Sequence, residues 1–301
     1  MRGRGRFLPA APGPGAPGDA GLYGPGSTAW RIARERTVLA GGPAALLLQV
    51  AHPLVAEGVR AHSGFATDPL QRLRGTLDAV LTVTFGDDAQ VRAAAAHVAR
   101  RHETVQGTLP TASSSLPAGT RYSANDPDLA LWVFATLAWT AIEVTEVFLR
   151  HVGPEERDAY YRDMTRLGRV FGVPDALLPA DYRGLRSYFD HQVRTTLDVG
   201  GAARSIAQQI LAPDPPIVPP PLRPVPALLA AGILPPALRE AYGLPWRRRD
   251  RIAFAVIRRA VRHAAPLLPA GLRYWPHYGV ACRRLAADGG RPQRAVRRRN
   301  R

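Results

Sequence analysis

The longest apolar stretch of the chain, Leu129 to Leu149, constrains the fold more than any other feature. It reads LALWVFATLAWTAIEVTEVFL and is long enough for a helix to cross a bilayer. However, Glu143 and Glu146 lie inside it, and ionised carboxylates are costly within a bilayer. We therefore predict a helix buried in the core of a helical protein, with Asp126 as its N-cap and Pro127 in its first turn.

A second apolar stretch, Leu39 to Val59, is also predicted to be a buried core helix, although it contains Gln49, His52, Pro53 and Glu57. Ser27 or Thr28 is expected to cap a helix that starts near Trp30. The remaining apolar periodicity predicts helices at 69–84, 88–106, 155–171, 181–198, 201–211, 236–242, 248–264 and 278–287.

Strand signals are weak along the whole chain. No alternating apolar pattern of useful length is present, and no internal repeat is found. Gly107 is expected to end the helix at 88–106 as a C-cap, with a loop at 108–120. The sequence therefore predicts an all-α fold, a multi-helix bundle.

Composition divides the chain into segments. Residues 1–27 are rich in glycine, proline and alanine, and we expect them to be disordered because they cannot bury enough apolar surface. Residues 28–212 form the expected helical core, and the proline-rich residues 213–226 an extended connector. Residues 227–290 are expected to be a smaller C-terminal helical section of the same domain, followed by a basic tail at 291–301.

Positive charge is concentrated at the two ends. Residues 239–301 carry 17 arginines against three acidic residues, and residues 1–36 carry six against two. Lysine is absent and proline is abundant, which is typical of a GC-rich genome, so part of the arginine count carries no functional signal. We expect a solvated basic surface, with peripheral membrane contact as the interaction it favours and no specific nucleic acid. No signal peptide is recognised, and a cytoplasmic location is expected.

Several enzyme classes are disfavoured because the motifs typical of them are missing from the sequence. No glutamate is followed by a histidine three residues later, which disfavours a di-iron carboxylate bundle. The zinc motif His-Glu-x-x-His, Cys-x-x-Cys, Gly-x-Ser-x-Gly and a Walker loop are also missing. Histidines in an apolar helical interior remain, and these suit haem ligation, although a hydrogen-bonded core histidine fits the same pattern.

Two polar patches stand out beside the apolar stretches. The first contains His52, His62, Arg72 and Thr76, and the last two are four residues apart, which places them on one face of a helix. The second is HVARRHETVQG at 97–107. We predict that the functional site lies between these two patches.

Eight short motifs, in order, resemble the family of the MpaB-type oxygenases and the latex-clearing rubber oxygenases, once a domain of unknown function. They span roughly residues 30–290 and are HPLVAEGVRAHSGF (52–65), DPLQRLRGT (68–76), FG (85–86), RRHETVQG (100–107), YSANDPDLALWV (122–133), GPEERDAYYRDM (153–164), FGVPDALLP (171–179) and YGLPW (242–246).

The resemblance implies a globin-like haem core, a b-type haem held by one histidine, and cleavage of a carbon–carbon double bond in an isoprenoid chain by O₂. It implies that His102 is the axial ligand and that Arg72 and Thr76 are pocket residues, with His52 the next candidate for cofactor contact. The rubber oxygenases have a lysine where this chain has Gly75, so closure of the distal side must differ or be absent. Many relatives have histidine at the position of Phe134.

An apolar interior predicts an unsaturated, largely hydrocarbon substrate selected by shape. No Gly-x-Gly-x-x-Gly motif for a nicotinamide or flavin is present, and incorporation of both atoms of O₂ into a cleaved alkene needs no external reductant. The alternative function is a non-catalytic basic helical protein that binds nucleic acid or a membrane surface.

Overall fold

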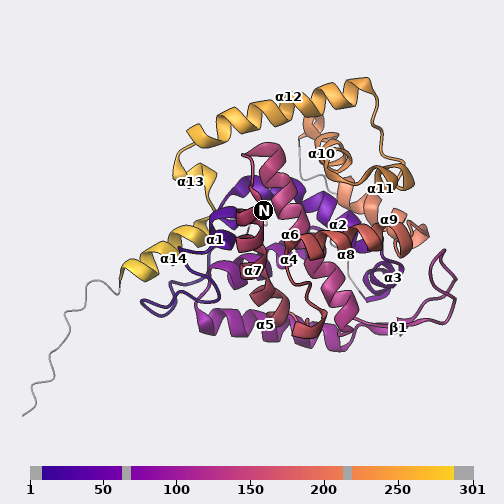
Figure 1. The fold of residues 1–301 in the computed structure, drawn as a ribbon, viewed down its shortest axis with the longest axis horizontal. Coiled ribbons are helices and arrows are strands. Elements are labelled where there is room, and N and C mark those ends of the chain that lie inside the picture. The colour runs from indigo at the N-terminus through magenta and orange to yellow at the C-terminus, as the bar shows by residue number, and fades with distance from the viewer. Residues whose placement is uncertain (1–8, 63–68, 213–218, 288–301) are drawn as a thin grey trace, which may run out of the picture.

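A computed structural model describes residues 9–62, 69–212 and 219–287, and it confirms the all-α prediction (Figure 1). The helices of the larger part are α1 (Thr28–Ala33), α2 (Gly42–Val50), α3 (Pro53–His62), α4 (Pro69–Phe85), α5 (Asp88–Glu103), α6 (Pro127–Phe148), α7 (Pro154–Val170), α8 (Tyr182–Thr195) and α9 (Gly201–Leu211). The C-terminal helices are α10 (Val225–Ile233), α11 (Pro236–Ala241), α12 (Arg248–Ala264), α13 (Ala270–Arg273) and α14 (Pro276–Ala286).

The apolar stretch at 129–149 forms the central helix, α6, as predicted. Asp126 accepts a hydrogen bond from the backbone N–H of Asp128, and Pro127 occupies the first turn. Although α6 is long and apolar enough to cross a membrane, 67% of its apolar window is buried inside the protein. Its two acidic residues are paired with arginines, Glu146 with Arg157 of α7 at 2.6 Å and Glu143 with Arg186 of α8 at 3.5 Å.

The second apolar stretch is not one helix. A 3₁₀ helix, η1 (Arg36–Gly41), leads into α2, and the chain then bends by 102° at Ala51 and His52 before α3 begins. Pro53 opens α3, where a proline is tolerated because the first N–H groups of a helix have no intrahelical partner. The carbonyl of Ala51 accepts a hydrogen bond from the N–H of Asp198, which fixes the bend against the segment between α8 and α9.

Most other predicted helices are confirmed with shifted ends, and Ser27 caps α1 through a hydrogen bond from the N–H of Trp30. The prediction for Gly107 is wrong. Helix α5 ends at Glu103 with Thr104 as its C-cap, and Gly107 lies in β1 (Gln106–Thr108). This strand pairs antiparallel with β2 (Arg121–Ser123), and Gly107 is opposite Tyr122. A Cβ at Gly107 would stand 2.7 Å from the hydroxyl of Tyr122, so the glycine permits this close approach.

The expectation of a disordered N-terminus is wrong for residues 9–27, whereas residues 1–8 lie outside the described part. Arg284 of α14, itself buried, donates to the carbonyl of Asp19 at 2.6 Å. The N–H of Ala16 donates to the carboxylate of Asp87 at 2.6 Å. These long-range hydrogen bonds, which the glycine-rich composition does not indicate, order the segment on the body of the protein.

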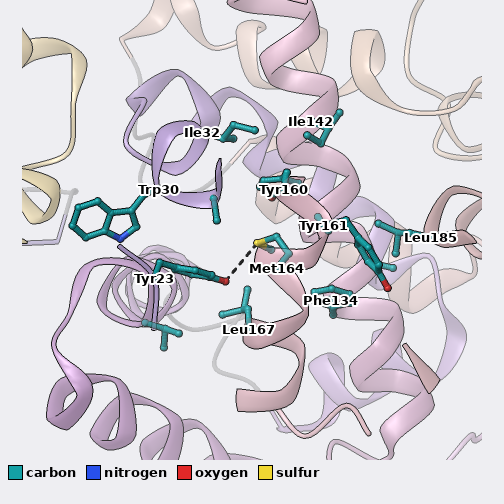
Figure 2. Packing of buried hydrophobic residues seen from close by; sticks show 14 of the residues in the cluster. Tyr23, Trp30, Ile32, Phe134, Ile142, Tyr160, Tyr161, Met164, Leu167 and Leu185 are labelled. Atoms are coloured by element: carbon teal, nitrogen blue, oxygen red, sulfur yellow. Dashed lines mark hydrogen bonds between the residues drawn. The ribbon is translucent and has the colours of Figure 1, made fainter. Parts of the chain in front are cut away.

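The main core lies between α1, α4, α6 and α7 (Figure 2). Tyr23 enters it from the N-terminal segment, and its hydroxyl lies 3.8 Å from the sulfur of Met164. The buried indole of Trp30 donates to the carbonyl of Thr84 at 2.7 Å, which joins α1 to α4. A second apolar cluster fills the space between α2, α6, α8, α9 and α10.

The C-terminal section packs on the body through α10 and α12, which contact α2 and α6. Part of the predicted connector is helical, because η4 (Pro220–Leu222) and the start of α10 fall inside 213–226, while residues 213–218 lie outside the described part. Tyr242 donates to the carbonyl of Leu47 in α2 at 2.7 Å. Beyond these contacts, α12 runs along the outer edge of the molecule (Figure 1).

Candidate functional site

The residues predicted for the site are carried by two consecutive helices. Arg72 and Thr76 lie on α4 and His102 lies in the last turn of α5. The helices are joined at Gly86 and Asp87, where Asp87 forms a capping box with Gln90 and starts α5. This short connection explains why motifs 26 residues apart in the sequence belong to one helical hairpin.

Near Thr76, the described surface of α4 is exposed. Thr76 is exposed, and the side chain of Arg72 lies outside the part of the structure that is described. A Cβ at Gly75 would meet no described heavy atom within 4 Å. The surface of α4 beside Thr76 is therefore open among the described residues, at the position where the resemblance implies a lysine in the rubber oxygenases.

His102 lies where the exposed helix α5 meets an apolar cluster. Its side chain is half-buried, and it has an interaction partner, as does Thr76. Three residues later, beyond the end of α5, Val105 packs on a cluster of four buried residues: Leu54, Leu109, Tyr122 and Leu129. The backbone holds this junction, since the N–H of Val105 donates to the carbonyl of His102 at 3.0 Å. His102 is thus half-buried in the last turn of α5, and the chain reaches the apolar cluster three residues later, at Val105.

His52 is buried at the bend between α2 and α3. Only 7% of its surface is exposed, and its Nδ1 has no hydrogen-bond partner among the described residues. Burial lowers the pKa of His52 to about 4, and the charge of Asp126 at the start of α6 opposes this shift only in part. The ring is therefore neutral at pH 7, the protonation state in which an imidazole can ligate a metal or accept a hydrogen bond.

One polar group at the site was missed in the sequence. Glu57 of α3 is buried, and Arg60 donates two hydrogen bonds to its carboxylate at 2.6 and 2.8 Å. Burial, together with the charge of Glu57, raises the pKa of the Tyr122 hydroxyl. Glu57 and Tyr122 both fall in family-like motifs, but only the fold brings α3 and β2 together.

His62 belongs to the same surroundings as Tyr122. Its Nε2 lies 3.0 Å from the carbonyl oxygen of Gln106, and its ring meets the ring of Tyr122 edge-on at 6.2 Å between centroids. His62 is the last residue of α3, and the next described residue is Pro69. The carboxyl ends of α3 and α5 therefore converge on the two-stranded sheet.

Two further features lie elsewhere. Phe134, at the position where many relatives are implied to have histidine, is buried in the main core with its ring centroid 6.3 Å from that of Tyr161. A cavity of about 310 Å³ lies beside α9 and is lined by Arg204, Tyr242 and their neighbours, with none of the predicted site residues. No cluster of three or more histidine, cysteine or acidic side chains suited to a metal ion is found among the described residues.

A haem is the cofactor that the resemblance implies, and its needs can be compared with these side chains. A haem needs one axial histidine, an apolar wall for the macrocycle and a cation for a propionate. His102 supplies a half-buried imidazole, His52 a second and neutral one, and the cluster of Leu54 and Tyr122 an apolar surface that Val105 reaches. The predicted cation, the side chain of Arg72, lies outside the described part.

Comparison with known proteins places the chain beside one enzyme family. A family model described as the catalytic domain of the ER-bound oxygenase mpaB/B' and of rubber oxygenase matches residues 30–263, a span that contains all the predicted site residues. An uncharacterized protein of Mycobacterium bovis and one of Mycobacterium tuberculosis are each 30% identical over 245 residues. The match covers 75% of this chain and 89% of each relative. No solved structure matches the chain.

Proposed function

The chain belongs to the catalytic-domain family of the MpaB and rubber oxygenases, and from this premise we propose that it is a haem-dependent oxygenase. Membership supports an oxygenase function in general. The finer proposal is that a b-type haem is bound and that O₂ cleaves a carbon–carbon double bond in an unsaturated, apolar, isoprenoid-like substrate. A cytoplasmic location is part of the same proposal.

The observation that carries the proposal is the position of His102. A half-buried imidazole in the last turn of α5, three residues before Val105 of the apolar cluster, can present one nitrogen to iron while the other donates a hydrogen bond. A haem held there by His102 would supply the iron that activates O₂. We assign the axial position to His102.

Arg72 and Thr76 are assigned to the pocket. A guanidinium stays charged at all working pH values and offers five donors, so Arg72 suits a haem propionate or the orientation of an oxygen atom. Thr76 offers one hydroxyl donor on the same face of α4, four residues later. Gly75 stands between them, and a Cβ there would meet no described heavy atom within 4 Å, so closure of this side would differ from that of the rubber oxygenases or be absent.

His52 is the second candidate for contact with the cofactor. Its lowered pKa keeps it neutral, so it adds no positive charge to the apolar interior and its Nδ1 can still act as donor or acceptor. We propose that His52 lines the site and does not replace His102 on the iron.

The substrate is proposed from the character of the wall. Leu54, Leu109 and Leu129 offer dispersion contacts and no hydrogen bonds, which suits a hydrocarbon chain. Cleavage of a double bond gives two carbonyl groups, each with one atom of O₂, so the reaction balances without an added reductant.

The test uses haem-reconstituted protein with squalene as the probe for an unsaturated isoprenoid chain. Under ¹⁸O₂, we expect carbonyl products that each carry one ¹⁸O atom, detected by mass spectrometry after rapid reduction to alcohols that prevents exchange with water. Products with a single labelled carbonyl per cleaved bond, or no products from any unsaturated isoprenoid tested, would contradict the proposed reaction.

A further inference from the structure

Helix α12 is attached to the protein by a narrow stripe of side chains. Phe254 is buried, and its ring lies 5.7 Å from the ring of Phe148 in α6, measured between centroids. Ile257 and Val261 are half-buried on the same side. A Cβ at Gly232 of α10 would overlap the ring of Phe254, which shows how closely α10 and α12 approach.

The opposite side of α12 carries two large apolar side chains that are exposed to solvent. At about 100° per residue, Ile252 and Val256 lie roughly 160° from Phe254, one on each side of the outermost line of the helix. Their exposed fractions are 54% and 61%. Arg249, Arg259 and other arginines flank them, so the apolar pair stands between basic side chains.

Exposed apolar residues continue beyond the end of α12. Leu267 is 83% exposed and Leu268 43%, both at the end of η5 (Ala265–Leu267), and Leu272 of α13 is 62% exposed. Of the seven large exposed hydrophobic residues in the described part of the chain, five lie between 252 and 272. This clustering distinguishes the segment from the rest of the surface, where single exposed apolar residues are ordinary.

The segment also carries one sign of charge. Between Arg247 and Arg273 the sequence has eight arginines and a single acidic residue, Asp250. The Asp250 carboxylate is engaged at the start of α12, where it accepts a hydrogen bond from the N–H of Arg247 at 2.8 Å. A partner for this surface must therefore be anionic and must also accept protruding apolar side chains.

We propose that α12, η5 and α13 form a membrane-docking face, with Ile252, Val256, Leu267, Leu268 and Leu272 inserted at the headgroup–acyl boundary of an anionic bilayer. An amphipathic helix with apolar side chains flanked by arginines has the composition of interfacial helices. Nucleic acid would satisfy the arginines but leave the apolar residues against phosphate groups. A flat protein partner would gain little from a narrow apolar strip that is flanked on both sides by charged side chains.

The proposal is independent of the haem chemistry. In Figure 1, α12 lies along one edge of the molecule and α5 along the opposite edge, so docking through α12 leaves the end of α5 uncovered. The face is held in place by the core contacts of Phe254 and by the ion pair of Arg273 with Glu35 at 2.7 Å. It differs from the basic tail at 291–301, which lies outside the described residues.

The experiment measures flotation of the full chain with vesicles of phosphatidylcholine containing 30% phosphatidylglycerol, and with pure phosphatidylcholine. We expect binding to the anionic vesicles and at least roughly tenfold weaker binding to the neutral ones. Ile252→Ser with Val256→Ser should reduce anionic binding by about tenfold or more. Leu177 is an exposed leucine outside this segment, in η3 (Asp175–Leu177). The Leu177→Ser variant is the apolar control and should bind the vesicles as the wild type does.

Charge is tested separately with Arg248→Gln and Arg259→Gln, which should weaken binding by roughly tenfold, against Arg183→Gln and Arg194→Gln on exposed positions of α8 as the control. A chain ending at residue 290 should retain binding. Unaltered helical circular dichroism and unfolding midpoint in each variant would show that the fold is intact.

Failure of the wild type to float, or wild-type flotation of the Ile252/Val256 variant, would overturn the proposal. Loss of binding on removing only residues 291–301 would assign the interaction to the tail. A change from dimer to monomer in the α12 variants would assign the face to a second copy of the chain. If the protein does not float but binds duplex DNA in a salt-sensitive way, and the arginine variants abolish that binding, the face would be assigned to nucleic acid. Haem content should be unchanged in all of these variants.

Discussion

Arg273 of α13 donates two hydrogen bonds to the buried carboxylate of Glu35, at 2.7 and 2.8 Å, and so joins residues 238 positions apart. The side chain of Glu35 is 6% exposed and that of Arg273 is 23% exposed. The bidentate geometry is the stronger form of an arginine–carboxylate contact. An adjacent bridge between Glu35 and Tyr274 pairs the two backbones, so the C-terminal section is fixed to the end of α1 at this point.

We therefore expect Arg273→Ala to lower the free energy of unfolding by about 2–3 kcal/mol, because it leaves a carboxylate buried without its partner. The measurement is urea unfolding followed by circular dichroism. Arg169→Ala removes an ion pair with Asp175 whose two side chains are largely exposed, and it should cost less than about 1 kcal/mol. Equal effects of the two variants would contradict the assigned role of Glu35.

Stability should depend on pH through His52. Its pKa is about 4 in the folded protein against an ordinary value of 6.5, so the unfolded chain takes up a proton first. Protonation then favours unfolding, and stability is lost as the pH falls from 6.5 towards 4, by at most about 3 kcal/mol from this residue. Burial also lowers the pKa of His277, which adds a loss of the same sign.

The check is the free energy of unfolding of wild type and His52→Leu between pH 7.5 and 4. The variant should have a flatter profile than the wild type. A His52→Leu profile parallel to that of the wild type would mean that burial does not lower the pKa of His52.

The pocket assignment on α4 predicts a contrast between two neighbouring arginines. Arg72→Ala should lower oxygenase turnover on the order of 100-fold, or reduce haem content, because a positioned charged donor is lost. Arg74→Ala, at an exposed position of the same helix, should stay within about twofold of wild type by our estimate, since an exposed charge away from the site contributes little. Thr76→Val should lower turnover with haem retained. Similar losses from Arg72→Ala and Arg74→Ala would remove Arg72 from the site.

Local chemistry in the sequence was enough to place most helices. The Asp126–Pro127 pair marks the start of α6, and Ser27 marks the start of α1, because capping depends on residues within one turn. Glu143 and Glu146 indicated a core helix, and the structure pairs both with arginines of neighbouring helices.

What the sequence did not predict depends on contacts between distant residues. Glycine is a common residue at a helix C-cap, but Gly107 lies in β1, where it faces the ring of Tyr122 on the paired strand. The ordering of residues 9–27 depends on Arg284 and Asp87, which no local pattern reveals. The bend at His52 is fixed by the hydrogen bond between Asp198 and Ala51.

At the candidate site, the two helices at 69–84 and 88–106 followed from the sequence, whereas their surroundings did not. The roles of Arg72, Thr76, His102 and His52 remain predictions. The buried carboxylate of Glu57, paired with the exposed Arg60, lies near Tyr122 only because the fold packs α3 against β2.

The central claim is that His102 holds a haem, and it is tested by the absorption spectrum of the full chain reconstituted with haemin. The wild type should show a Soret band that shifts when carbon monoxide is added to the reduced protein, because one axial position is open. His102→Ala should lose this band, while His97→Ala, at an exposed position of the same helix, should keep it. A wild type without a Soret band, or a His102→Ala variant with the wild-type spectrum, would contradict the account.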